Sequence, residues 1–323
     1  MVVNVSNKKK YAYIFLFVGL ISILIYFMSK YSTHSLIISP LSESDIESID
    51  FSVEQRVPWG VKYQTQIENK QVIRKVKVAI LDSGIDKFHK DLEGKIVKEF
   101  NTITHDQDAS DEFSHGTAVA GVIASNDNDI GLIGIALSAE LYSVKVLDKD
   151  GKGEIDDFIE GIKWCIQNQV DIINISIGIK KGNDELKRVV TDAYDRGIIL
   201  VAAAGNNYRN EVDYPAAYEE VFSVTAIDHL EHPYNLASTG KIDFSAPGVE
   251  ILSLAPNNGY GIYEGTSMAA PHVTGIVANL LASSSYPSNS STVKAIKNKL
   301  KDMSKDLGSK GYDKVYGYGS LTN

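Results

Sequence analysis

The segment Val76–Asp86, with the sequence VKVAILDSGID, joins a run of aliphatic residues to an aspartate and a turn. Its first part, Val76–Leu81, has the length and the Val/Ile content of a strand that is buried on both faces. Asp82 follows at once, so the segment predicts a carboxylate at the carboxyl end of a buried strand. Taken alone, an aspartate at such a place is an ordinary turn former or helix cap.

Four further apolar runs repeat this pattern and alternate with amphipathic segments. The runs cover residues 141–147, 170–175, 198–203 and 221–226. Helix-like spacing of apolar residues covers 154–169 and 184–196, and Gly197 stands where the second helix would end. This alternation predicts an α/β fold in three layers, a doubly wound, mostly parallel sheet with helices on both faces. Such sheets bind ligands at the carboxyl ends of their strands.

The composition narrows the class of protein. A chain of 323 residues with 44% hydrophobic content can bury the core of one large domain or two small ones. The net charge of -9 and the lack of a basic cluster after Lys10 argue against nucleic-acid binding. Cys165 is the one cysteine, so an intramolecular disulfide and a multi-cysteine zinc site are excluded. It falls on the apolar stripe of a predicted helix, which indicates a core thiol.

The N-terminal part differs from the rest of the chain. Residues 1–10 end in three lysines, and residues 11–28 form an uncharged run of membrane-spanning length. Because the lysines precede the run, we expect a cytoplasmic basic end and a transmembrane signal-anchor at 11–28. Residues 29–53 would then be a polar linker to an extracellular domain at 54–323. The alternative is a signal peptide that is cleaved to release a secreted protein, although no Ala-x-Ala site is found.

Two segments place polar side chains beside predicted helices. Ser114-His115-Gly116-Thr117 opens a run of small residues, so an imidazole would lie near the start of a helix. The sequence GTSMAAPH, residues 265–272, precedes an apolar run that predicts a buried helix with Ser267 at its N-terminus. Backbone N–H groups there stabilise developing negative charge. Singly, the histidine would be a structural hydrogen-bonding residue and the serine an N-cap.

Together these segments resemble the three signature blocks of the subtilisin family of serine peptidases, over about residues 55–321. The blocks are Asp82-Ser83-Gly84, His115-Gly116-Thr117 and residues 265–271, in the order Asp, His, Ser that this family uses. The resemblance implies that Ser267 is the nucleophile and that His115 is the general base and then the general acid. Asp82 would fix the tautomer of His115 and stabilise the imidazolium.

The resemblance also implies an oxyanion hole and a peptide-binding cleft. Asn206, which alone would be an ordinary turn residue, would complete the oxyanion hole with the N–H of the nucleophile. One segment would pair with the substrate backbone as an extra strand and form one wall of the P1 pocket. It consists of Ser176, Ile177 and Gly178. The opposite wall would consist of Ala203, Ala204 and Gly205.

Asp213 precedes the pair Tyr214-Pro215, and the resemblance implies that it lies at the base of the P1 pocket. A carboxylate there would favour Lys or Arg at P1. The alternative is a surface-loop acid that is turned toward solvent.

A structural calcium ion is also implied. The segment that starts at Gln55 resembles the start of mature secreted subtilisins, in which this glutamine binds calcium. The remaining expected ligands are all oxygens, which suit a hard cation. The full set is Gln55, Asp91, Asn126, Asn128, Ile130 and Leu132. By itself, the Asn/Asp-rich loop would be an ordinary turn.

The sequence therefore predicts a monomeric serine endopeptidase that acts on peptides or proteins and processes exported peptides or leader sequences, with a preference for basic P1 residues. The alternative is a catalytically silent peptide-binding module of the same fold. A lipase-like hydrolase is disfavoured, because its motif Gly-x-Ser-x-Gly would precede the Asp and the His. Between Met28 and Gln55 we expect no folded propeptide of the kind that subtilisins carry.

Overall fold

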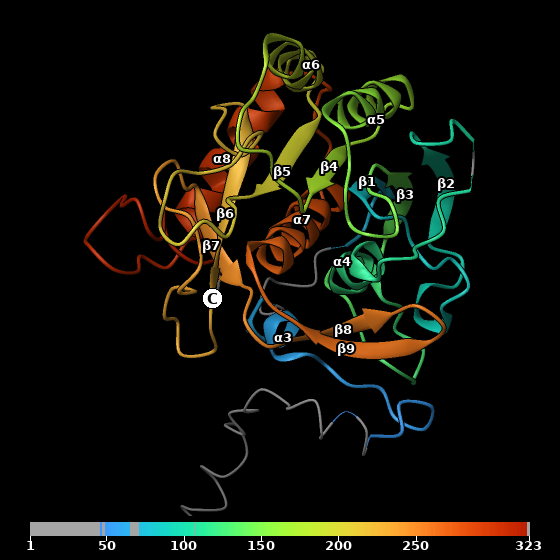
Figure 1. Cartoon of the computed structure of the whole chain (residues 1–323). Coiled ribbons are helices and arrows are strands. Elements are labelled where there is room, and N and C mark those ends of the chain that lie inside the picture. The colour runs from blue at the N-terminus through green and yellow to red at the C-terminus, as the bar shows by residue number, and fades with distance from the viewer. Residues whose placement is uncertain (1–45, 47–48, 65–70, 107, 322–323) are drawn as a thin grey trace, which may run out of the picture. The chain divides into compact units, whose positions relative to one another are not determined.

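The computed structural model describes residues 46, 49–64, 71–106 and 108–321 (Figure 1). The predicted basic end, the predicted anchor at 11–28 and most of the predicted linker lie outside the described residues. Within the described ranges, no helix is both long and apolar enough to cross a membrane. The fold below belongs to the unit Pro40–Asn323.

A seven-stranded sheet forms the centre of this unit, and every neighbouring pair of its strands is parallel. The strands are β1 (Val76–Asp82), β2 (Ile96–Asn101), β3 (Ala139–Lys145), β4 (Ile172–Ile175), β5 (Ile199–Ala203), β6 (Val221–Ile227) and β7 (Phe244–Pro247). Their order is β2-β3-β1-β4-β5-β6-β7, so the chain winds in opposite directions on the two sides of β1. The predicted doubly wound sheet is confirmed, and its switch point lies beside the strand that ends in Asp82.

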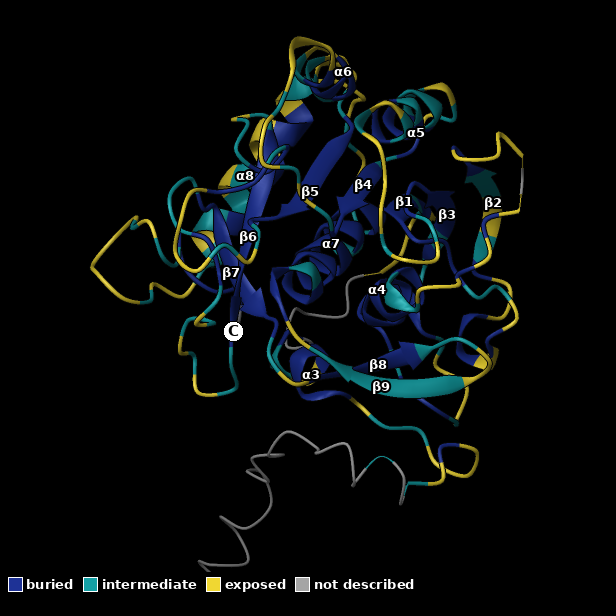
Figure 2. Cartoon of the chain, viewed as in Figure 1, coloured by how far each residue is buried: buried dark blue, intermediate teal, exposed yellow. Residues whose placement is uncertain are grey.

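Helices cover both faces of the sheet, which confirms the three predicted layers. One apolar core cluster contains side chains of α4 (His115–Ala124), α7 (Thr266–Ala282) and α8 (Ser290–Met303). A second cluster contains side chains of α5 (Ile155–Gln167) and α6 (Asp184–Asp195). Figure 2 shows α7 as almost wholly buried, whereas α5 and α6 turn exposed faces outward. An apolar helix without a polar stripe requires this central position.

The two amphipathic helices begin and end close to the predicted bounds. Asn183 caps α6 through its Oδ1, which accepts the N–H of Leu186 at 2.7 Å. Gly197 follows α6 with a φ of 83°, a conformation that glycine adopts at little cost. Cys165 is fully buried in α5, as expected of a core thiol.

Several elements were not predicted. The edge strand β2 exposes Val97 and Lys98, and β7 is short and ends in a proline, so neither has the pattern of a buried strand. The other elements that were not predicted are α3 (Trp59–Gln64), the short 3-10 helix η1 (Lys90–Leu92), the hairpin strands β8 (Ile251–Ala255) and β9 (Gly259–Tyr263), and the helix α8. The hairpin loop holds Asn257 and Asn258 at positive φ, which asparagine tolerates better than most residues.

Candidate active site

The first element of the site is a buried carboxylate that holds an imidazole. Asp82 ends β1 and is fully buried, and His115 begins α4. Nδ1 of His115 lies 2.8 Å from Oδ1 and 2.9 Å from Oδ2 of Asp82, so Nδ1–H donates to the carboxylate. The His115 side chain keeps 21% of its surface exposed, against none for Asp82. Nε2, the remaining ring nitrogen, is left without a proton and can accept one.

Small residues allow this approach between α4 and the end of β1. A Cβ on Gly116 would lie 2.0 Å from the carbonyl oxygen of Gly84, so only glycine fits after His115. The N–H of Gly116 donates to Oγ of Ser83 at 3.0 Å. Packing therefore requires the glycine after His115, and the Ser83 hydroxyl accepts its N–H at this contact.

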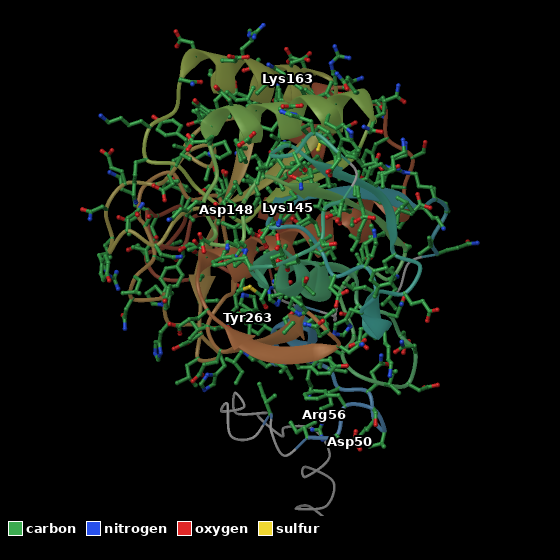
Figure 3. The ribbon with its side chains drawn as sticks, turned by 45° about the vertical axis from the view of Figure 1, so that its right-hand side comes forward. Asp50, Arg56, Lys145, Asp148, Lys163 and Tyr263 are labelled. Carbon is green, nitrogen blue, oxygen red and sulfur yellow. The ribbon has the colours of Figure 1, made fainter. Side chains whose placement is uncertain are left out.

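Lys145 fixes the turn after β1 from the neighbouring strand. Its Nζ donates to the carbonyl oxygen of Ser83 at 2.7 Å and to that of Ser110 at 3.1 Å. Figure 3 shows Lys145 toward the middle of the domain, in contrast to Lys163 on the outer helix α5. The Lys145 side chain is only 6% exposed, so its charge acts inside the protein.

Asp111 is a functional-site residue that the sequence interpretation missed. Its Oδ1 accepts the N–H of Ser114 at 2.8 Å and the hydroxyl of Ser83 at 2.8 Å. Burial works to lower the pKa of His115, but the charge and hydrogen bond of Asp82 and the charge of Asp111 outweigh it and raise that pKa above its ordinary value. An acidic residue four positions before His115, at the start of a helix, was the available signal.

Ser267 lies in the first turn of α7, and a second segment is tied to its backbone. Pro271 has no N–H, so the carbonyl of Ser267 loses the helical partner that it would otherwise have four residues on. Oγ of Ser176, just after β4, donates to this carbonyl at 2.8 Å. Asn174 donates in turn to Oγ of Ser176 at 2.9 Å. The proline thus leaves an acceptor that joins the end of β4 to the helix of Ser267.

Asn206 faces the same small space as Ser267. Its Oδ1 accepts from N and Oγ1 of Thr266, at 3.1 and 3.2 Å, which directs Nδ2 away from Thr266. A Cβ on Gly265 would lie 3.0 Å from Nδ2 of Asn206 and 3.4 Å from Oγ of Ser267. An amide donor and a hydroxyl therefore border one space that a glycine leaves open.

Residues 74–319 match the Subtilase family, about three quarters of the chain. The chain belongs to the subtilase family. Over 246 residues this subtilase is 41% identical to the thermostable alkaline protease of Halalkalibacterium halodurans, covering 75% of the chain and 67% of the relative. Subtilisin DY of Bacillus licheniformis is 39% identical, with 76% and 88% covered, and a subtilisin of Bacillus pumilus is 39% identical, with 83% and 97% covered. The chain is accordingly a serine endopeptidase.

The two segments expected as walls of the P1 pocket lie on either side of Asp213. A Cβ on Gly178 would lie 2.6 Å from Cβ of Asp213, and a Cβ on Gly205 would lie 2.3 Å from its Oδ2. The N–H of Asp213 donates to the carbonyl of Ala204 at 2.9 Å. Asp213 is only 7% exposed, so the alternative of a loop acid turned toward solvent is wrong.

The other expected wall residues are placed as follows. Ala203 ends β5 and, like Ala204, is buried. These two residues would therefore offer mainly their backbone to a P1 side chain. Ile177 is half-buried and, with Gly178, borders a cavity of about 420 Å³. Phe158 and Leu147 line the same cavity, which gives it an apolar side.

Three of the expected calcium ligands converge on one atom. Nε2 of Gln55 lies 2.7 Å from the carbonyl oxygen of Asn126, 3.2 Å from that of Ile130 and 3.4 Å from Oδ1 of Asn128. Nε2 is thus surrounded by three oxygens, as a bound cation would be. If the Gln55 amide rotated, its own oxygen would face the same point and add a fourth ligand. These residues therefore fit a calcium ion.

Asp91, the expected carboxylate ligand, contacts the end of the same loop. It is fully buried, and its Oδ2 accepts the N–H of Leu132 at 2.7 Å. Burial raises its pKa, against the opposing effects of that hydrogen bond and of His89, so its charge lacks full stabilisation. No group of three or more His, Cys, Asp or Glu side chains suited to a metal occurs in the described part of the chain. The expected site needs only one carboxylate, that of Asp91.

Proposed function

We propose that this subtilase cleaves peptide bonds through Ser267, His115 and Asp82. The hydrogen bonds from His115 Nδ1 to both oxygens of Asp82 carry the proposal, because they leave Nε2 as the base. Oγ of Ser267 attacks the scissile carbonyl and gives its proton to Nε2. The C–N bond breaks as His115 returns that proton to the leaving amine, and a water activated in the same way then releases the acyl group.

Asn206 would stabilise the tetrahedral intermediates of both steps. Its Nδ2 and the backbone N–H of Ser267 at the start of α7 are the donors for the oxyanion. The bonds from Thr266 to Asn206 Oδ1 support this role, because they hold the amide in the orientation that aims its N–H groups at the site. A donor fixed before the reaction stabilises developing charge without reorganisation.

The substrate would be an exported peptide or protein, such as one that carries a leader sequence. Its backbone would pair with residues 176–178 as an added strand, and its P1 side chain would point toward Asp213. The near-complete burial of Asp213 supports a preference for Lys or Arg at P1, because a cation would stabilise a poorly solvated carboxylate.

Calcium would be held by the oxygens around Gln55 and by Asp91. The ion would stabilise the folded loop and would take no part in the chemical steps. For the site of action, the run at 11–28 supports a catalytic domain held outside the cell by an anchor, or a secreted domain if that run is cleaved.

The test is cleavage of a mixed peptide library by the full chain in the presence of calcium, with Ser267→Ala as the control. We expect cleavage that disappears in the variant and a P1 pattern dominated by Arg and Lys. Folded wild-type protein that binds peptides without cleaving them would instead support the silent binding module. Cleavage mainly after aromatic residues would leave the endopeptidase intact and contradict the basic P1 preference.

A further inference from the structure

Asp213 has a cationic partner from its own chain. Nζ of Lys180 lies 3.3 Å from Oδ1 of Asp213, and within the described ranges it is the one Lys, Arg or His side chain that forms an ion pair with this carboxylate. Nδ2 of Asn207 donates to the same oxygen at 2.8 Å. The carboxylate that we place at the base of the P1 pocket is therefore already partly neutralised before a substrate arrives.

The two oxygens of Asp213 face different surroundings. Oδ2 lies against the backbone of Gly205 and Gly178, at 2.3 and 3.1 Å from the Cβ positions that these glycines lack. Oδ1 meets Asn207 and Lys180, which line a cavity of about 1010 Å³ together with Asn206 and Asp213 itself. One oxygen thus faces the expected walls of the pocket, and the other is bound by Asn207 and Lys180.

Backbone hydrogen bonds fix the position of Lys180, and its side chain is largely exposed. Ile179 and Tyr214 exchange two backbone hydrogen bonds of 2.9 Å, which hold the residue before Lys180 beside the residue after Asp213. The Lys180 side chain is 71% exposed, whereas that of Asp213 is 10% exposed. Because Lys180 is largely solvated and Asn207 still donates to Asp213 in its absence, we expect that Lys180 can be replaced without unfolding the domain.

We propose that Lys180 is a specificity-determining residue that weakens the attraction of Asp213 for basic P1 side chains. The inference rests on the proposed role of Asp213 in P1 recognition. The ammonium of Lys180 offsets part of the carboxylate's charge through Oδ1, so an incoming P1 cation gains less from Oδ2 than it would from an unpaired Asp213. An uncharged P1 side chain, such as phenylalanine, gains nothing from this charge and is unaffected.

The experiment compares Lys180→Gln, Asp213→Asn and the double variant. Lys181→Gln is the matched control, because it removes the same charge from the next residue along an exposed stretch. The measured quantity is kcat/KM for two peptides that differ only in Arg or Phe at P1. We expect Lys180→Gln to raise the Arg-to-Phe ratio about two- to fivefold, the size that a pair with a largely solvated ammonium allows, and Lys181→Gln to change it much less. In the Asp213→Asn background, Lys180→Gln should have no effect on the ratio.

The outcomes separate the two proposals. If Asp213→Asn lowers the ratio but Lys180→Gln leaves it unchanged, or changes it no more than Lys181→Gln, the role of Lys180 is overturned and that of Asp213 stands. An effect of Lys180→Gln that persists with Asn at position 213 also overturns it. If Asp213→Asn itself leaves the ratio unchanged, the P1 role of Asp213 fails, and the role of Lys180 fails with it. Melting temperatures of all four variants control for folding.

Discussion

Asp111 binds Thr117 twice: its Oδ2 accepts the backbone N–H of Thr117 at 2.9 Å and the Thr117 hydroxyl at 2.6 Å. Its Oδ1 meanwhile accepts the N–H of Ser114, so one carboxylate satisfies donors on both sides of His115 in the first turn of α4. The same charge contributes to the raised pKa of His115. Asp111 therefore both fixes the start of the helix that carries the imidazole and adjusts its proton affinity.

We expect Asp111→Asn to shift the acid limb of the kcat/KM profile to lower pH. Only neutral His115 can act as a base, and its pKa is raised in part by Asp111, so removing this charge lets His115 lose its proton at a lower pH. The helix should also lose about 1 kcal/mol of capping, because an amide cannot accept from every donor that the carboxylate meets. Asp150→Asn is the control, since Asp150 is an exposed acid. An equal shift in both variants would exclude a specific role for Asp111.

Replacing Asn206 tests the oxyanion hole by two routes. Asn206→Leu removes the donor, and Asn206→Asp keeps an acceptor for Thr266 but places a negative charge where the oxyanion would form. Loss of one such donor, as measured in subtilisin itself, lowers turnover by about 10²–10³. We expect a fall of that size for leucine and a larger one for aspartate, with little change in KM. A rise in KM at unchanged kcat would instead assign Asn206 to substrate binding.

The sequence predicted those parts of the fold and site that depend on local pattern. The buried strands and the helix of Ser267 were predictable because their residues are apolar throughout, and Asp82 was predictable at a strand end. Asp111 was not, because its role depends on contacts with Ser83 and Thr117 that only the folded turn creates.

The start of the folded domain also depends on contacts that the local sequence pattern does not indicate. Phe51 was assigned to the polar linker at 29–53, but its ring stacks on Tyr260 with centroids 3.9 Å apart, and it is only 8% exposed. Its carbonyl accepts the N–H of Gly131, in the loop expected to bind calcium. A single aromatic residue in a polar segment has no periodicity that could indicate this packing. Ordered packing at Phe51 therefore begins before Gln55.

Calcium removal should destabilise the chain through the loop that contacts Gln55. We expect EDTA to lower the melting temperature, because a bound ion stabilises only the folded state. Asn128→Ala, which removes the Oδ1 near Gln55 Nε2, should reduce that EDTA-dependent shift. Asp127→Ala is the matched control in the same exposed loop, since no ligand is expected from its side chain. A melting temperature that is unchanged by EDTA in the wild type would contradict the calcium site.

His272 should make the folded state sensitive to acid. Burial lowers its pKa to about 4, against the opposing effect of the hydrogen bond from its Nδ1 to the carbonyl of Met268 at 2.7 Å. Its Nε2 is buried against Gly60, where an added Cβ would lie 2.3 Å away, and has no hydrogen-bond partner among the described residues, so a proton there would be an unpaired buried donor. Between pH 6.5 and 4 the unfolded chain binds the proton more readily, and this residue alone should therefore lower the free energy of unfolding by about 3 kcal/mol over that range.

His272→Asn tests this effect, because its amide can keep a donor near Met268 but does not titrate. Denaturant unfolding would be measured from pH 7 to pH 4 with calcium present, in a Ser267→Ala background that prevents self-digestion. We expect the His272→Asn variant to lose less stability on acidification than its parent, whatever its stability at pH 7. His232→Asn, at a side chain that is 67% exposed, should retain the parental slope. Parallel slopes for the parent and the His272→Asn variant would show that His272 does not cause the acid sensitivity.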